Sequence, residues 1–347
     1  MKITLKDIAR ELNISTAAVS RALNDLPGVG NELRLNVKET AVRMGYTKYL
    51  KASMMNSYER SMKFIVVLYG PIGGHLIHDI LLGVDETIRR KGYHELRYMI
   101  DTSNELQTER AKELFFNQLA EERGVVGVLS CYIKLSDVLI SKLQQRNLPV
   151  VLIENETEYG RCVTLDHVKA SYRAVTRLVE LGRKNIGFIT PPEDEDRTWH
   201  DRFEGYRSAL RDKGLPYDPT LVTYCDWVRV RSGGLATKKL LEQRPTVDAI
   251  VYGSDTLAAG GMRMLRDLGK RVPEDMAVIG FDDEEFDVTL DPPLSTVRQP
   301  VRRMAATGLQ LLFESIDKGD YSHRAIQLDT ELILRGSCLA GVDKTWV

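Results

Sequence analysis

The sequence predicts a small all-α headpiece followed by an α/β core of two doubly wound parallel-sheet subdomains. Apolar residues between positions 4 and 24 recur at helical spacing. From Phe64 onward, continuous apolar runs alternate with helical segments of about 15 residues, a pattern typical of parallel strands covered on both faces. The chain has 347 residues, which is too long for one compact core.

The first predicted helix begins after Thr4, a good N-cap, and Asp7 is the acidic half of a capping box. Asn13 follows the helix, at a tight corner that needs a residue tolerant of positive φ. The apolar residues of this helix share one face: Leu5, Ile8, Ala9 and Leu12.

The second predicted helix is capped by Ser15 and buries Val19, Ala22 and Leu23. The opposite face carries small and hydrogen-bonding side chains: Thr16, Ala17, Ser20, Arg21 and Asn24. Together the two helices predict a helix-turn-helix that reads DNA. The alternative is an ordinary amphipathic helix pair, which shares the periodicity but not the joint placement of Ala9, Asn13 and Val19.

A third helix is predicted with Leu33, Val37 and Ala41 inside, and the polar residues 47–61 then form a linker with conditional helicity. Residues 1–60 carry a net charge of +4 and the remainder −5. A basic module on a mildly acidic body suits contact with phosphates.

The composition excludes several classes of protein. No apolar segment is long enough for a membrane span and no signal region follows the N-terminus, so we expect a cytoplasmic protein without membrane contact. The four cysteines have no CxxC spacing, which argues against a disulfide frame or a zinc site. We expect no cofactor.

Three segments could suggest an enzyme or a metal site, and each has a simpler interpretation. The turn GPIGGH at 70–75 lacks the spacing of a phosphate loop, so we interpret it as a plain strand-to-helix turn, for which the rim of a ligand cleft is one location. His75 and His78 lie beside Asp79, but no second cluster supplies further metal ligands. The charged run at 194–202, with His200, is expected to be a solvated loop. No nucleophile motif is present, so we expect no enzyme activity.

Carboxylates follow three of the apolar runs: Glu154, Asp255 and Asp282. At the carboxyl ends of parallel strands they would line a crevice and accept hydrogen bonds from a hydroxyl-rich ligand. Arg202 and Trp227 lie on the loops between, and an indole face suits a sugar ring. The alternative for each carboxylate alone is a helix N-cap.

The chain closely resembles the lactose/galactose repressor (LacI/GalR) family over essentially its full length. The matching segments are TLKDIARELNISTAAVSRALN at 4–24, RFEGYRSAL at 202–210, SDTLAAGGMRMLRDLGKRVPEDMAVIGFDD at 254–283 and PPLSTVRQP at 292–300. The resemblance implies a headpiece, a hinge helix and a core like the periplasmic sugar-binding proteins, acting as a homodimer on a near-palindromic operator. The implied parts are a headpiece at 1–46, a hinge at 47–61, a core N-terminal subdomain at 62–165 and 296–322, a C-terminal subdomain at 166–295 and 323–337, and a tail at 338–347.

The resemblance also implies roles for single residues. For DNA contact they are Thr4, Ser15, Thr16, Ala17, Ser20, Arg21 and Asn24 in the headpiece, and Ala52 and Met55 in the hinge. For the effector they are His75, Glu154, Arg202, Trp227, Asp255 and Asp282. The hinge departs from the family pattern, with Lys48 and Tyr49 in place of Pro and Asn. The segment GHLI at 74–77 replaces an aromatic one, which favours a saccharide over a flat purine.

These observations predict a repressor of carbohydrate-utilisation genes, controlled allosterically by a small sugar-like effector that binds between the core subdomains. One alternative is a regulator of the same family that responds to a purine or another metabolite. Others, from different classes, are a solute-binding protein without a regulatory role and an α/β enzyme using Asp255 and Asp282 as an acid–base pair.

Overall fold

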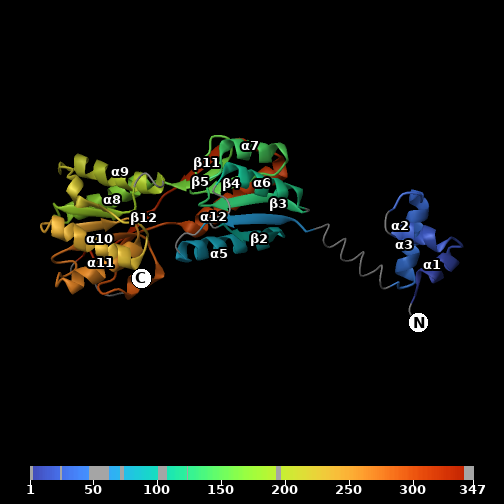
Figure 1. Cartoon of the computed structure of the whole chain (residues 1–347), viewed down its shortest axis with the longest axis horizontal. Coiled ribbons are helices and arrows are strands. Elements are labelled where there is room, and N and C mark those ends of the chain that lie inside the picture. The colour runs from blue at the N-terminus through green and yellow to red at the C-terminus, as the bar shows by residue number, and fades with distance from the viewer. Residues whose placement is uncertain are drawn as a thin grey trace. The chain divides into compact units, whose positions relative to one another are not determined.

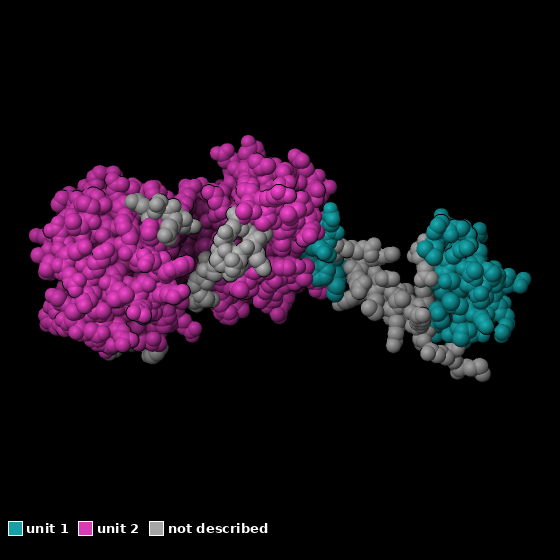
Figure 2. Space-filling view, viewed as in Figure 1, with its two compact units in different colours: residues 1–64, 121–125 teal, residues 65–120, 126–347 magenta. Residues whose placement is uncertain are grey.

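The computed structural model describes residues 3–23, 26–46, 62–70, 74–100, 108–122, 124–192 and 197–339. The chain divides into two compact units, residues 1–64 with 121–125 and residues 65–120 with 126–347 (Figure 2). Ala52, Met55 and Asn24 lie outside the described residues, as does the side chain of His75.

The first unit contains the three predicted helices, α1 (Leu5–Glu11), α2 (Thr16–Leu23) and α3 (Asn31–Arg43). The Asp7 carboxylate accepts hydrogen bonds from the backbone N–H and the hydroxyl of Thr4, at 2.8 and 2.6 Å. Asn13 has φ of +51°, so the predicted left-handed corner is confirmed. The buried residues at the centre of the three helices are Ile8, Ala9, Val19, Ala22, Val37 and Ala41.

The second unit contains two six-stranded sheets, and the first has the strand order β11-β5-β4-β3-β1-β2 (Figure 1). Its strands are β1 (Phe64–Tyr69), β2 (His94–Met99), β3 (Val125–Cys131), β4 (Val150–Ile153), β5 (Arg161–Leu165) and β11 (Arg324–Leu328). Its helices are α5 (Gly74–Lys91), α6 (Glu109–Glu121), α7 (Asp137–Gln145) and α12 (Val301–Lys318). Helices α5 and α12 pack together and bury apolar side chains against the sheet. We call this layer structure the first subdomain.

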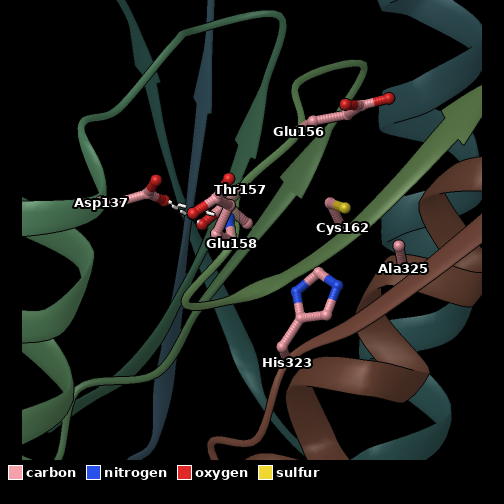
Figure 3. A pocket seen from close by; sticks show the side chains of 7 residues that line it. All are labelled: Asp137, Glu156, Thr157, Glu158, Cys162, His323 and Ala325. Atoms are coloured by element: carbon pink, nitrogen blue, oxygen red, sulfur yellow. Dashed lines mark hydrogen bonds between the residues drawn. The ribbon is translucent and has the colours of Figure 1, made fainter.

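A cavity of about 520 Å³ lies at the β5–β11 edge of the first subdomain (Figure 3). Its lining residues are Asp137, Glu156, Thr157, Glu158, Cys162, His323 and Ala325. The Thr157 hydroxyl donates to Asp137 at 2.5 Å, and the His323 ring bonds the carbonyl of Gly160 at 3.0 Å. None of the described residues that were predicted to bind an effector lines this cavity.

The second sheet has the order β12-β10-β9-β8-β6-β7 and forms the second subdomain. Its strands are β6 (Ile186–Thr190), β7 (Val222–Tyr224), β8 (Ala249–Tyr252), β9 (Ala277–Asp282), β10 (Ser295–Arg298) and β12 (Glu331–Ile333), the last antiparallel to β10. Its helices are α8 (His167–Glu180), α9 (Arg197–Asp212), α10 (Val230–Gln243) and α11 (Asp255–Asp267). Helices α8 and α9 pack as one pair and α10 and α11 as another (Figure 1). The predicted pair of parallel-sheet subdomains is confirmed.

The strand pairing corrects two of the expected subdomain boundaries. Strand β10 was expected to begin the return to the first subdomain at residue 296, but it pairs with β9 in the second sheet. Strand β11 was expected in the second subdomain, but it pairs with β5 in the first. The chain therefore crosses between subdomains after residues 298 and 328, because hydrogen bonding along these short strands decides which sheet they join.

Helices α10 and α11 approach each other closely. A Cβ added to Gly260 of α11 would lie 1.8 Å from the carbonyl oxygen of Val230, and one added to Gly233 of α10 would lie 2.1 Å from that of Leu257. Real Cβ atoms cannot occupy such positions, so the two helices touch through their backbones. This contact requires glycine at both positions.

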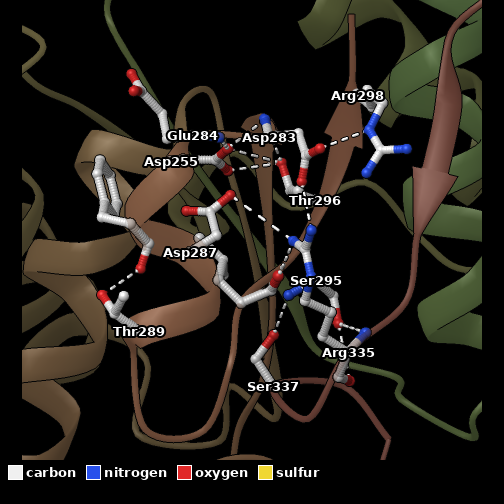
Figure 4. Close-up of polar contacts among 12 residues, drawn as sticks. Asp255, Asp283, Glu284, Asp287, Thr289, Ser295, Thr296, Arg298, Arg335 and Ser337 are labelled. Carbon is white, nitrogen blue, oxygen red and sulfur yellow. Dashed lines mark hydrogen bonds and ion pairs between the residues drawn. The ribbon is translucent and has the colours of Figure 1, made fainter. Parts of the chain in front are cut away.

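A pair of carboxyl groups is buried beneath the end of β9 in the second subdomain (Figure 4). Asp255 accepts from the hydroxyl of Thr296 at 2.7 Å and from the backbone N–H of Asp283 at 2.6 Å. Asp287 is also fully buried, and its nearest cation is Arg335 at 3.9 Å. Burial and the neighbouring Asp255 raise the pKa of Asp287 to about 11, so Asp287 holds a proton at neutral pH.

We expect Gly260→Ala to lower the free energy of unfolding by about 1–3 kcal/mol, because the added methyl group separates α10 from α11. Urea denaturation measures this change. Leu235→Ala removes an exposed side chain from α10 and serves as the control, with an expected change below about 0.5 kcal/mol. Equal stability of the Gly260→Ala variant and the wild type would contradict the backbone contact.

We expect Asp287→Asn to flatten the dependence of stability on pH. In the unfolded chain Asp287 loses its proton near pH 4, whereas in the folded chain it keeps the proton until about pH 11. Folding therefore takes up a proton between these values, and stability falls as the pH rises. The variant should gain stability relative to the wild type between about pH 5 and pH 9 in urea denaturation series. Identical pH slopes would show that Asp287 is ionised in the folded chain.

Candidate functional site

Helix α2 presents a row of small polar side chains at the surface of the first unit. The Ser15 hydroxyl accepts from the backbone N–H of Ala18 at 3.1 Å, which confirms the predicted cap. Thr16, Ala17 and Arg21 are exposed, and Ala17 and Arg21 lie on the side of the helix opposite the buried Val19. Arg21 is the only long side chain of this row, and Ser20 is half-buried.

The loop between α2 and α3 is fixed by a residue that the sequence reasoning missed. The Arg34 guanidinium on α3 donates to the carbonyl oxygens of Leu26 at 2.9 Å and Val29 at 3.3 Å. A Cβ on Gly28 would lie 3.8 Å from the Arg21 guanidinium, so this loop also approaches the end of α2. Arg34 thus ties the helix that carries Arg21 to α3. An arginine that bonds carbonyls eight and five residues away leaves no local sequence signal.

A cavity of about 350 Å³ in the second unit lies between the two subdomains, which contribute opposite walls. One wall comes from residues that follow β3 and β4 and from the end of β5, the other from the first turns of α8 and α9. The lining residues are Tyr132, Lys134, Glu154, Asn155, Glu156, Thr164, Leu165, His167, Arg197, Thr198 and Asp201. We call this space the cleft. Of the six residues predicted for the effector, Glu154 is in its lining.

Arg202 and Asp282 lie behind the cleft wall and form a buried polar cluster. The Arg202 side chain is 4% exposed, and its guanidinium lies 3.7 Å from the Asp282 carboxylate and donates to the carbonyl of Gly253. Its central carbon lies 3.6 Å from the centre of the Phe281 ring. Burial lowers the pKa of Arg202, and the charges of Asp282 and Glu154 oppose this shift. Burial likewise raises the pKa of Asp282 well above its usual range, and the positive charge of Arg202 opposes this shift and favours the carboxylate.

His167 connects this cluster with Glu154 and was not predicted. Its Nε2 lies 2.5 Å from Oε2 of Glu154, and its Nδ1 accepts from Nε of Arg202 at 3.4 Å. His167 comes two residues after the end of β5, so it follows an apolar strand as Glu154 does. This position was the sequence signal that could have identified it, but only carboxylates were predicted at such positions.

Several residues at these strand ends have left-handed backbone angles. The φ values are +59° for Tyr132, +62° for Glu154 and +124° for Asp282. Such angles cost about 1–3 kcal/mol each and cluster where a structure holds side chains for a ligand. Within the described structure, Oε1 of Glu154 and the hydroxyl of Tyr132 are buried and have no hydrogen-bond partner. Both residues belong to the lining of the cleft.

The prediction that Asp255 binds the effector is wrong, because its side chain does not face the cleft. Its side chain is fully buried, and its carboxylate is occupied by the N–H groups of Asp283 and Glu284 and by Thr296. It supports the loop after β9 from below. An acid–base pair of Asp255 and Asp282 would have no access to a substrate at Asp255.

Trp227 and the charged run at 194–202 are both placed differently from their predictions. Trp227 is 67% exposed on the loop before α10, where the Arg229 guanidinium lies 5.7 Å from its ring centre, and it does not line the cleft in this structure. The charged run at 194–202 was expected to be a solvated loop, but α9 begins at Arg197 and its first residues line the cleft. The helical period of RTWHDRFEGY, read from Arg197, was the signal that could have placed it.

In the part of the chain that the structure describes, no helix is long and apolar enough to cross a membrane. In the same residues, no group of three or more histidine, cysteine or acidic side chains could hold a metal ion.

Two known protein families match separate parts of the chain. Residues 4–48 match the family described as bacterial regulatory proteins, lacI family, and residues 175–338 match the periplasmic binding protein-like domain. The transcriptional repressor CytR of Escherichia coli is 32% identical over 342 residues, which cover 97% of this chain and 96% of CytR. The transcriptional regulator RegA of Clostridium saccharobutylicum is 29% identical over 98% of this chain and 100% of its own length.

A solved structure of a transcriptional regulator CelR–cellobiose complex is also similar. It is 27% identical in sequence, has a TM-score of 0.69, and covers 97% of this chain and 100% of its own. The full-length match to CytR and the helix-turn-helix geometry of α1 and α2 lead to one conclusion. This chain belongs to the LacI family of bacterial DNA-binding transcription regulators, which are not enzymes.

Proposed function

We propose that this regulator is a repressor of carbohydrate-utilisation genes and that a sugar-like effector bound in the cleft changes its affinity for operator DNA. The observation that carries the proposal is the lining of the cleft, which is polar on both walls and includes a carboxylate oxygen and a phenol hydroxyl that have no hydrogen-bond partner among the described residues. A ligand rich in hydroxyl groups can satisfy both atoms. The volume of about 350 Å³ falls within the range of small-molecule sites.

The composition of the lining favours a sugar over a purine base. Among the lining residues that the structure describes, Leu165 has the only aliphatic side chain, and Tyr132 and the smaller His167 have the only aromatic rings. A flat base gains affinity by stacking on aromatic or apolar walls, whereas hydroxyl groups gain it from carboxylates and amides. The similarity to a CelR structure that holds cellobiose supports the same choice.

The reading surface on α2 is proposed to contact the major groove. Thr16, Ala17 and Arg21 would reach base edges, and Ser15 and Ser20 would contact phosphates or bases. The Thr4 hydroxyl, which donates to Asp7, lies at the exposed start of α1, where it can contact a phosphate. Asn24, Ala52 and Met55 keep their predicted roles as proposals.

A homodimer is proposed because one headpiece offers few base contacts and because several large apolar side chains are exposed on β2 and α6 of the first subdomain. Tyr98 and Met99 on β2 and Leu114 on α6 are exposed, and the Tyr98 ring contacts Phe115 of α6 edge to face. Two headpieces would occupy half-sites roughly 34 Å apart, one turn of the double helix. Linkage then requires that effector and operator change each other's affinity by the same factor.

We expect Arg21→Ala to lower operator affinity roughly 5- to 150-fold, the loss of about 1–3 kcal/mol for a bidentate pair with guanine. Fluorescence anisotropy with a palindromic duplex, selected from random DNA by the wild-type protein, measures the affinity. Arg43→Ala is the control, because it removes the same charge from α3, where Arg43 pairs with Glu11 at 3.1 Å. Equal losses in the two variants would show that Arg21 acts only through its charge.

We expect Glu154→Gln to weaken sugar binding at least tenfold while operator affinity without sugar stays within threefold, since a hydrogen bond to a charged group is worth about 1.5–3 kcal/mol. Calorimetric titration with a panel that includes cellobiose, ribose and adenine identifies the sugar and measures its affinity. Glu158→Gln, which changes a residue of the edge cavity instead, should leave sugar binding unchanged. Binding of adenine, and of no sugar, would refute the carbohydrate assignment.

A further inference from the structure

His167 joins the two walls of the cleft. Glu154 follows β4 of the first subdomain, whereas His167 begins α8, whose next turns lie in the core of the second subdomain. Both side chains are buried, and Nε2 of His167 lies 2.5 Å from Oε2 of Glu154. On its other side the ring meets Arg202 at 3.4 Å and Phe281 at a centroid distance of 5.8 Å.

The partners of the ring decide where its proton lies. A guanidinium can only donate, so Nδ1 of His167 must present its lone pair to Nε of Arg202. The proton of a neutral ring is then on Nε2, which donates it to Glu154. A doubly protonated ring would direct an N–H group at the N–H of Arg202 and lose this contact.

We propose that His167 is a positioning residue of the effector site: as a neutral ring protonated at Nε2, it holds Glu154 against Arg202 and keeps the two cleft walls together. The effector role rests on the proposed function, but the effect on the cleft walls does not. Because His167 occupies Oε2 of Glu154, the other oxygen, Oε1, is left for a ligand. A ligand bound there contacts the first subdomain directly and the second through His167.

A second contact crosses the cleft at its surface, where Arg197 of α9 pairs with Glu156. Both side chains are more than half exposed, and exposed ion pairs contribute little to stability. The buried hydrogen bond is made to a charged acceptor away from water and is therefore the stronger link. Arg197→Gln accordingly serves as the matched control, because it removes a cross-cleft contact without changing the buried one.

Two substitutions of His167 test its hydrogen bonds to Glu154 and to Arg202 separately. In His167→Gln, the side-chain N–H₂ stands near the position of Nε2 and can still donate to Glu154. In His167→Asn, the shorter side chain places its amide near Nδ1, within reach of Arg202 but not of Glu154. The proposal requires the Gln variant to resemble the wild type and the Asn variant to differ.

The separation of the walls is measured in the full-length protein without any effector. Spin labels are attached to Val138→Cys on α7 and Leu235→Cys on α10, which are exposed, whereas the four native cysteines are buried. Double electron–electron resonance then gives the distance between subdomains. Molecules with the short distance have the cleft walls together, and molecules with a longer distance have them apart. We expect His167→Asn to lower the ratio of the first population to the second at least tenfold, and His167→Gln and Arg197→Gln to change it less than threefold. A wild-type distance distribution in the Asn variant, or an equal effect of Arg197→Gln, overturns the proposal.

Two further measurements complete the test. The ¹⁵N shifts of the wild-type His167 ring should show a neutral ring with its proton on Nε2, and a proton on Nδ1 or on both nitrogens overturns the proposal even if the Asn variant fails to fold. For a sugar that binds the wild type, His167→Asn should weaken binding at least tenfold and His167→Gln less than threefold. If no sugar in the panel binds, the proposed function fails, whereas the distance and ¹⁵N results still decide the role of His167.

Discussion

The geometry of the cleft depends on the buried guanidinium of Arg202. A cation that is 4% exposed is stable only if acceptors and a nearby negative charge replace its water. The acceptors come from three elements: the carbonyl of Gly253 after β8, the carboxylate of Asp282 at the end of β9, and the ring of His167 at the start of α8. The Phe281 ring covers one face of the guanidinium. One side chain therefore fixes the relative positions of several strand and helix ends, and through His167 it also reaches the opposite wall.

Asp282 can face Arg202 because a second buried group holds the backbone beyond it. Asp283 has φ of +60°, and its N–H is bound by the Asp255 carboxylate while its own carboxylate pairs with Arg335 at 2.6 Å. The oxygen atoms of Asp255 fit only because residue 280 has no side chain, since a Cβ there would lie 2.0 Å from one of them. The carboxylates at the strand ends thus divide into two groups. Glu154 is directed into the cleft, and Asp255 stabilises the loop that presents Asp282.

The sequence predicted those features that depend on neighbouring residues in the chain. The capping of α1 by Thr4 and Asp7, the left-handed Asn13 and the apolar runs of the strands are all of this kind. The roles of Glu154 and Asp255 could not be separated, because both follow an apolar strand and only distant partners such as Thr296 distinguish them. The crossing points after residues 298 and 328 depend likewise on which sheet offers free hydrogen bonds to a short strand.

The composition of the reading surface limits what one headpiece can contribute to operator recognition. Arg21 is the only described outward side chain on α2 that can form a bidentate pair with a base, which is worth about 1–3 kcal/mol of discrimination. Thr16 and Ser15 are short, and Ala17 offers only a methyl group. Specific recognition of an operator commonly requires about 4–10 kcal/mol over non-specific binding. The described residues of one headpiece supply only part of this difference, and the proposed second headpiece and the shape of the DNA between the half-sites would supply more. An effector that changes only how two such headpieces are presented can therefore control binding without altering any contact on α2.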